Sequence, residues 1–94
     1  MGRKVRKEYY TAQFKRDIKR LQKSGECTRE ELQNVIDMLR ADEPLPPHMK
    51  DHPLKGEWKP SWDCHVRPDL VLIYTKIPGE LHLRRLGSHS DLFG

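Results

Sequence analysis

The chain has 94 residues, of which 35% are hydrophobic and 34% are charged, and it carries a net charge of +4. This length suits one small domain, so we expect residues 1–94 to form a single domain with a small core. The sequence has neither an apolar run long enough for a membrane-spanning helix nor the apolar core of a signal peptide, so we expect a cytoplasmic location.

The first third of the chain is basic, because residues 1–23 hold nine Lys or Arg against two acids. Residues 5–10 alternate weakly and predict an edge strand. An apolar stripe at helical spacing follows, and Gly25 stands where that helix would end. The stripe consists of Tyr10, Phe14, Ile18 and Leu21. The charge suggests contact with a polyanion, most often nucleic acid, but charge alone favours the simpler explanation of a solvated helix face.

The second predicted helix is marked by its first turn. Thr28 and Glu31 have the spacing of a capping box, in which each side chain accepts from the other residue's backbone N–H. An apolar stripe follows, formed by Leu32, Val35, Ile36 and Leu39. The short link between Ser24 and Cys27 predicts a helical hairpin.

Prolines then interrupt the chain as far as residue 60, which excludes a continuous helix and suggests a functional loop. From Trp62 the side chains alternate, with Trp62, Cys64 and Val66 on one face and Asp63, His65 and Arg67 on the other. A turn at residues 67–69, an apolar strand at 70–76, a Pro78-Gly79 turn and a strand at 81–86 complete a meander, and residues 88–94 are interpreted as a tail. The pattern predicts an α+β fold with two N-terminal helices packed on a small antiparallel sheet.

Three histidines of the C-terminal half are candidates for acid–base chemistry. His65 alternates with Asp63 and lies close to Asp69, which makes it a candidate base or orienting group, although a lone histidine there is more often structural. His52 has a restrained, extended backbone because a proline follows it. His89 lies near the end of the chain, where a structural histidine has little to pack against. The hypothesis of a site depends on these groups converging.

Such a set matters because RNA supplies its own nucleophile, the 2′-hydroxyl, so that a base, an acid and a cation suffice to cut it. Arg84 and Arg85 offer the cation. Strict alternation places Arg85 on the same face as Leu81 and Leu83, which belong in the core. If Arg85 works in a site, the strand must twist, bulge or end before it.

The remaining candidates for chemistry are weaker. His48 and His82 are interpreted as surface residues. The spacing of His48 and His52 would suit zinc only in a helix, which the flanking prolines disfavour, so no metal and no cofactor is expected. Cys27 and Cys64 lack metal-ligand spacing and are interpreted as reduced thiols.

Two longer motifs are more specific. Residues 50–56, Trp58 and residues 63–74, together with the ending at residues 85–94, resemble the YafQ-type branch of the RelE toxin superfamily. The resemblance covers the chain and is strongest over residues 50–94. It implies a RelE-like fold, with helices on a twisted antiparallel sheet. One position departs from the family pattern: Leu70 stands where the family usually has Trp, which bears on sequence preference more than on chemistry.

The resemblance implies the toxin of a type II toxin–antitoxin pair, a metal-independent endoribonuclease that enters the ribosomal A site and cuts mRNA. Its partners would be the ribosome with its RNA, the mRNA and a DinJ-like antitoxin, with no membrane. The implied catalytic residues are His52, His65, Asp69, Arg85 and His89. The implied substrate-binding residues are Asp63, Phe93, Lys55 and Arg84.

In this interpretation either His52, or Asp69 with help from His65, is the base, and His89 is the acid. Arg85 stabilises the charge on the phosphate, and Phe93 stacks on a base. The alternatives are a non-catalytic nucleic-acid-binding module, an inactive toxin relative acting through protein partners, and a metal-dependent nuclease.

Overall fold

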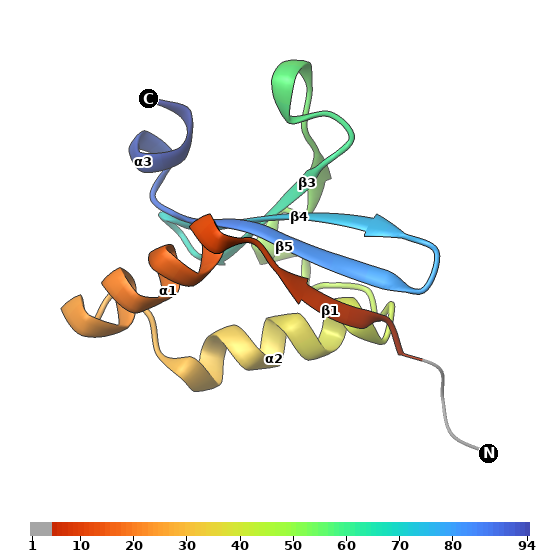
Figure 1. Cartoon of the computed structure of the whole chain (residues 1–94), viewed down its shortest axis with the longest axis horizontal. Helices are drawn as coiled ribbons and strands as arrows, with labels where there is room; N and C mark the ends of the chain where they lie inside the picture. Colours follow the sequence, from red (N-terminus) through yellow and green to blue (C-terminus); the bar gives the residue numbers. More distant parts are fainter. Residues whose placement is uncertain (1–4) are drawn as a thin grey trace.

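The structure is a computed structural model that describes residues 5–94, and its centre is one five-stranded sheet in the order β1-β5-β4-β3-β2 (Figure 1). The strands are β1 (Lys7–Tyr10), β2 (His52–Pro53), β3 (Trp62–Arg67), β4 (Leu70–Ile77) and β5 (Glu80–Gly87). Strands β2 to β5 pair antiparallel, which confirms the predicted meander, but β1 pairs parallel to β5. The sheet is therefore mixed, because a helical crossover and not a hairpin follows the first strand.

Two helices, α1 (Ala12–Ser24) and α2 (Arg29–Arg40), lie along one face of the sheet (Figure 1). Helix α1 begins after Thr11, whose side chain accepts from the Phe14 N–H at 3.0 Å, and it ends at Gly25 with φ +80°. Tyr10 belongs to β1 and not to the helix. Helix α2 has the predicted capping box, with bonds of 3.0 and 3.2 Å between Thr28 and Glu31.

The main core lies between these helices and the sheet. Phe14 and Leu21 of α1 are fully buried there, and β4 contributes alternate residues. The other face of β4, with Val71 and Ile73, is also buried, as expected for a strand in the middle of the sheet. Leu70, the departure from the family pattern, is 4% exposed in the helix-side core, so its side chain fills space there.

Two irregularities of register change which way the charged strand residues face. In β3 the register shifts between His65 and Arg67, and Arg67 turns toward α2, where it pairs with Glu31 at 2.6 Å. The expectation that Arg67 shares a face with Asp63 and His65 is therefore wrong, because the bulge adds one residue to the alternation.

The second irregularity lies in β5. Tyr74 pairs with Leu83, and its neighbour Ile73 pairs with Arg85, so Arg84 is an extra residue. This bulge moves Arg85 away from the face of Leu83 and onto the face of Ile73. Arg85 could take part in a site only if the strand twisted, bulged or ended before it, and the structure shows a bulge at that position.

A second layer covers the opposite face of the sheet. It consists of the loop that carries the 3₁₀ turn η2 (Gly56–Trp58) and of α3 (His89–Phe93), which rise above the sheet in Figure 1. Leu54, Trp58 and Leu92 pack there on β4. The other 3₁₀ turn, η1 (Pro47–Met49), lies beside β3.

The expectation of a C-terminal tail is wrong, because residues 89–93 are helical. Ser88 and Asp91 form a capping box, with both bonds at 3.1 Å, and Leu92 anchors the helix on the sheet. None of the helices in residues 5–94 has the length and apolar character that a membrane crossing requires.

Candidate active site

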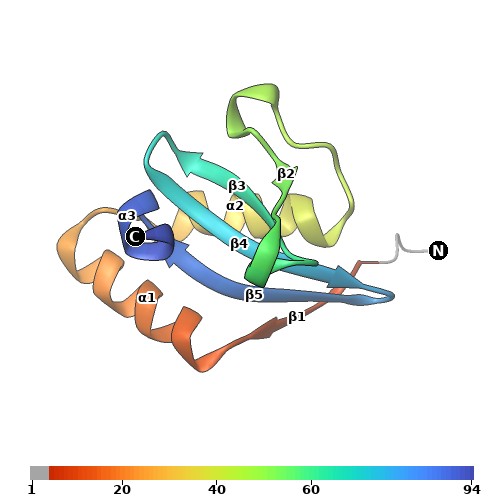
Figure 2. The same ribbon diagram turned by 90° about the horizontal axis from the view of Figure 1, so that it is seen from above.

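The candidate residues gather on the sheet face opposite α1 and α2. His52, Asp63, Ile73 and Arg85 form one row across four neighbouring strands, because each pairs in register with the next. Residues paired in register point to the same face, and His65, two residues after Asp63, joins them. The η2 loop and α3 stand on either side of this face, as the view from above shows (Figure 2). The row therefore forms the floor of the site.

His52 is held by its Nδ1 atom. That nitrogen lies 2.6 Å from the backbone carbonyl of Lys50, which itself has a left-handed φ of +48°. A carbonyl oxygen only accepts, so Nδ1 carries the hydrogen and Nε2 of the neutral ring keeps its lone pair. With its side chain 52% exposed, His52 presents a free basic nitrogen.

Asp63 lies behind His52, with its side chain only 4% exposed. Its Oδ1 is 3.0 Å from His52 Nδ1, which is ion-pair distance, yet it receives no well-directed hydrogen bond, since that N–H is directed to Lys50. Burial raises the pKa of Asp63, and the charges of His52, His65 and His89 oppose that shift. Asp63 therefore supplies a buried carboxyl group beneath the histidines.

His89 is oriented by Asp69, from the turn between β3 and β4. Asp69 Oδ1 accepts from both the Nδ1 and the backbone N–H of His89, at 2.8 and 3.1 Å. The hydrogen bond from the His89 side chain is the main cause of the lowered pKa of Asp69, which stays ionised and leaves His89 Nε2 free. The His65 ring meets the His89 ring edge-on at 5.0 Å. The contact between the His65 and His89 rings therefore joins the strand residues of the site to α3.

Aromatic rings form one side of the site. Phe93 is 41% exposed and lies 6.2 Å from the His89 ring and 6.0 Å from the Trp58 ring. The guanidinium of Arg84 lies over Trp58 at 6.0 Å and donates to Ser61 Oγ at 2.8 Å. These half-exposed rings and the cation can receive the bases and phosphates of a single strand.

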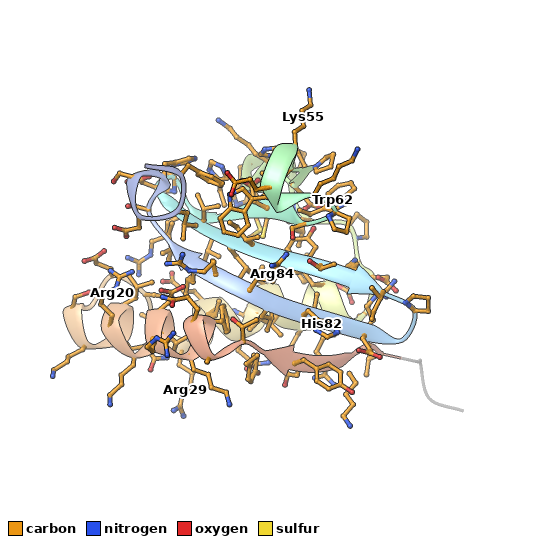
Figure 3. All side chains as sticks on the ribbon, turned by 45° about the horizontal axis from the view of Figure 1, so that its top comes forward. Arg20, Arg29, Lys55, Trp62, His82 and Arg84 are labelled. Atoms are coloured by element: carbon orange, nitrogen blue, oxygen red, sulfur yellow. The ribbon has the colours of Figure 1, made fainter. Side chains whose placement is uncertain are left out.

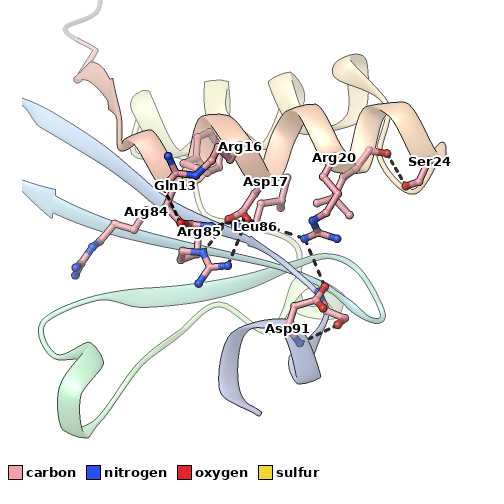
Figure 4. Close-up of polar contacts among 12 residues, drawn as sticks. Gln13, Arg16, Asp17, Arg20, Ser24, Arg84, Arg85, Leu86 and Asp91 are labelled. Atoms are coloured by element: carbon pink, nitrogen blue, oxygen red, sulfur yellow. Dashed lines mark hydrogen bonds and ion pairs between the residues drawn. The ribbon is translucent and has the colours of Figure 1, made fainter.

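Arg85 is fixed from the side of α1 (Figure 4). Its Nε and Nη2 donate to the two carboxylate oxygens of Asp17, at 2.8 and 3.3 Å, and this hydrogen-bonded pair raises the pKa of Arg85. The guanidinium stays charged, with its side chain 24% exposed. A fixed, permanently charged planar group suits a phosphate.

Most of the expected site residues are thus brought to one face. Lys55 is the exception: it stands at the tip of the η2 loop and points away from the sheet (Figure 3). His48 is exposed, as expected, whereas His82 is half-buried, bonded to Glu80 at 2.7 Å and stacked on Tyr9. Cys27 and Cys64 are buried free thiols. No three His, Cys, Asp or Glu side chains within residues 5–94 are arranged to hold a metal ion.

Two residues of the site were missed by the sequence reasoning. Trp58 was recognised only as part of a motif, although a tryptophan in a polar, proline-rich loop is itself a signal. Asp17 interrupts an apolar helix face, since it lies between Phe14 and Leu21 at helical spacing. A charged residue at such a position needs a partner, and this requirement was the available signal.

Known proteins similar to this chain show the family to which it belongs. Residues 6–94 match the family model described as bacterial toxin of type II toxin–antitoxin system, YafQ. The chain is 38% identical over 85 residues to the mRNA interferase toxin YafQ of Escherichia coli K12, which covers 90% of this chain and 92% of that protein.

Solved structures are similar over the same length. A copper-bound mutant toxin from Helicobacter pylori has a TM-score of 0.88 and 43% identity, covering 95% of this chain and 99% of that chain. YafQ in the E. coli DinJ–YafQ toxin–antitoxin complex has a TM-score of 0.85 and 38% identity, covering 96% and 99%. With a family match over nearly its whole length and a relative above 30% identity, this chain belongs to the YafQ family of bacterial toxins from type II toxin–antitoxin systems.

Proposed function

We propose that this protein is an mRNA interferase, a metal-independent endoribonuclease that cuts mRNA in the ribosomal A site. The observation that carries the proposal is the gathering of a free histidine nitrogen, a second histidine fixed by a carboxylate, and a fixed arginine on one sheet face. The mRNA 2′-hydroxyl attacks the adjacent phosphorus, the bond to the 5′-oxygen breaks, and a 2′,3′-cyclic phosphate forms.

His52 is the better of the two candidate bases. Its Nδ1–H is bonded to the Lys50 carbonyl, so Nε2 can take the proton of the 2′-hydroxyl. Asp69 is a poor base, because its pKa is lowered and its Oδ1 is occupied by His89. Asp63 acts through His52, limiting the rotation of its ring from below.

His89 is the acid that protonates the 5′-oxygen leaving group through Nε2. Asp69 remains ionised while His89 loses and regains its proton, and it keeps the ring in one orientation. Acid–base catalysis of this kind contributes roughly 10²–10⁴-fold, so the ribosome must supply much of the remaining orientation of the RNA. His65, in edge contact with His89, limits the movement of that ring.

Arg85 stabilises the charge that builds on the phosphate. Phe93 and Trp58 offer ring faces to the bases of the A-site codon, contacts worth about 1–3 kcal/mol per base in single-strand binding. Arg84, tied to Trp58 and Ser61, holds a neighbouring phosphate. Lys55 meets RNA farther from the cut, because it lies at the loop tip.

When it is not on the ribosome, the protein would bind an antitoxin similar to DinJ, which is bound to YafQ in the E. coli complex. Since ribosomes and mRNA are its substrates, the protein would act in the cytoplasm. Residues 1–94 would serve as one catalytic domain.

The test is cleavage of an mRNA held on a programmed 70S ribosome, mapped by primer extension, with His89→Ala beside the wild type. We expect a cut within the A-site codon and a kcat about 10²–10⁴-fold lower for His89→Ala. His48→Ala is the matched control, because it removes an exposed loop histidine outside the proposed set.

Phenanthroline separates the proposal from a metal-dependent nuclease, since it removes transition metals and leaves the Mg²⁺ that ribosomes need. Cleavage should persist in its presence. A wild-type protein that binds ribosomes without cutting the mRNA would overturn the proposal in favour of a binding module or an inactive relative.

A further inference from the structure

Asp17 is an unusual residue for its place in the fold. It lies on the face of α1 that packs on the sheet, between the buried Phe14 and Leu21, and is only 2% exposed. A buried carboxylate is costly unless its oxygens are well bonded. The groups that donate hydrogen bonds to the Asp17 carboxylate therefore indicate the role of this residue.

One of these bonds closes an open edge of the sheet. Strand β1 pairs with β5 only as far as Leu83, so beyond that point β5 is paired with β4 on one side and has no strand on the other. Asp17 Oδ2 accepts from the Leu86 N–H at 3.0 Å, in place of a strand partner. This contact fixes the carboxylate against β5 just past the bulge.

Within α1, Gln13 Nε2 donates weakly to Asp17 Oδ1 at 3.4 Å and Arg20 lies 4.0 Å from the same oxygen. The two shorter side-chain bonds fix the guanidinium of Arg85. Asp17 Oδ2 accepts from Nε at 2.8 Å, and Oδ1 accepts from Nη2 at 3.3 Å. Asp17 thus occupies the Nε edge of the guanidinium and leaves both N–H groups of Nη1 to face another acceptor. A two-point bond of this kind sets the plane of the guanidinium as well as its position.

The bulge makes such a support necessary. The extra residue Arg84 places Arg85 on the site face at the point where the strand is irregular. A long side chain leaving an irregular backbone has many rotamers, and a carboxylate bonded to both its guanidinium and the next backbone N–H removes that freedom. Figure 4 shows Asp17 reaching from α1 to both groups.

We propose that Asp17 is a positioning residue for the reaction, which holds Arg85 so that the free edge of its guanidinium meets the scissile phosphate. This inference rests on the proposed function of the site. Asp17 itself touches no substrate and acts only through Arg85.

The first test is a double-mutant cycle on ribosome-dependent cleavage with Asp17→Asn, Arg85→Ala and the double variant. An asparagine can still accept from the Leu86 N–H, but its amide group would meet the donors of Arg85. We expect Asp17→Asn to lower kcat by about 10–100-fold, as for a misplaced catalytic group, with KM near the wild-type value. In the Arg85→Ala background it should cause no further loss of kcat.

The matched control is Asp37→Asn, which makes the same chemical change at an exposed position of α2 and should leave kcat unchanged. A purely structural role for Asp17 predicts an equal loss with and without Arg85, accompanied by a loss of folded protein. That outcome, or wild-type kcat for Asp17→Asn, would overturn the inference.

A second measurement does not depend on activity or on the folding of a variant. In ¹⁵N NMR of the wild type, the Nε–H of Arg85 should give a distinct resonance protected from exchange at neutral pH, and it should persist when a 2′-deoxy RNA analogue is bound. If the Arg85 Nε–H instead gave a rapidly exchanging resonance at the position of solvent-exposed arginines, the inference that Asp17 positions Arg85 would be wrong. If the resonance is protected but the wild type cuts no mRNA, then the proposed function fails and the geometry of Arg85 stands.

Discussion

At the scale of single residues, the two histidines of the proposed acid–base pair are held in the same way but by different partners. Each is bonded through Nδ1, one to the Lys50 carbonyl and the other to the Asp69 carboxylate. Both rings therefore present Nε2 to the substrate. The sequence predicted these residues as candidates but left the base undecided, because a tautomer is set by hydrogen bonds between distant residues.

Asp63 is the residue where stability and activity should oppose one another. Its buried Oδ1 lacks a well-directed hydrogen bond, and burial raises its pKa. We expect Asp63→Asn to increase the free energy of unfolding at pH 7 by about 1 kcal/mol, the lower end of the cost of such a group. Its kcat should fall at least about tenfold, because His52 loses its support. Urea unfolding and ribosome-dependent cleavage measure the two effects.

The pH dependence of this stability difference follows from the raised pKa. A carboxyl group whose pKa is higher in the folded state binds protons more readily there, so falling pH favours folding through this group. The gap between Asp63→Asn and the wild type should be greatest at neutral pH. It should narrow as the pH falls toward the ordinary range of an aspartate. A gap that widens in acid would contradict the burial argument.

At the scale of elements, α3 is a helix whose capping signal is present in the sequence, although residues 88–94 were predicted to be a tail. Ser88 and Asp91 have capping-box spacing, but the acidic residue is Asp and the helix has only five residues. Such a short helix has little stability of its own and forms because Leu92 docks on Val71 and Ile73. The longer helix α2, with the same box and a full apolar stripe, was predicted correctly.

The caps of α2 and α3 offer a matched pair of substitutions. Thr28→Ala should cost about 1 kcal/mol of stability and leave kcat unchanged, since α2 lies on the face opposite the site. Ser88→Ala should cost less stability, because α3 is short and terminal. It should lower kcat by up to about fivefold, because His89 and Phe93 lie on α3. Thermal unfolding and cleavage assays distinguish the two, and equal effects on kcat would contradict this division.

The positions of the two β-bulges could not be predicted from the sequence. Period-two alternation predicted the faces of Asp63 and His65 correctly and failed for Arg67, because one extra residue reverses the face. For Arg85 the same rule exposed a conflict between a core position and a site role. The bulge at Arg84 resolves it, and only the pairing of β4 with β5 reveals where that bulge lies.

At the scale of the whole molecule, the two faces of the sheet have different tasks. One face carries the site, and the other is covered by α1 and α2 over the main core. The basic side chains of α1 lie on its outer surface, and one of them, Arg20, pairs with Asp91 of α3 at 3.6 Å. All are exposed, namely Lys15, Arg16, Lys19, Arg20 and Lys23. The positive charge of the first third of the sequence thus forms a basic surface on α1, whereas the proposed site residues lie on other elements.

This separation predicts that charge on α1 governs binding and not chemistry. Reversing Lys15, Lys19 and Lys23 to Glu should raise KM for programmed ribosomes while kcat at saturation stays near wild type. The salt dependence of ribosome binding should become less steep by about one unit of slope for each phosphate that the variant no longer neutralises. At high salt the variant and the wild type should converge, because screening removes the contribution of exposed charges.

The same variant tests whether the antitoxin inhibits by occupying this surface. An acidic antitoxin segment on α1 would compete with ribosomal RNA, so charge reversal should weaken both interactions together. Binding to purified antitoxin and to ribosomes can be measured on the same preparation. Loss of ribosome binding alone would place the antitoxin elsewhere, and retention of both would show that the basic face of α1 is only a solvated surface.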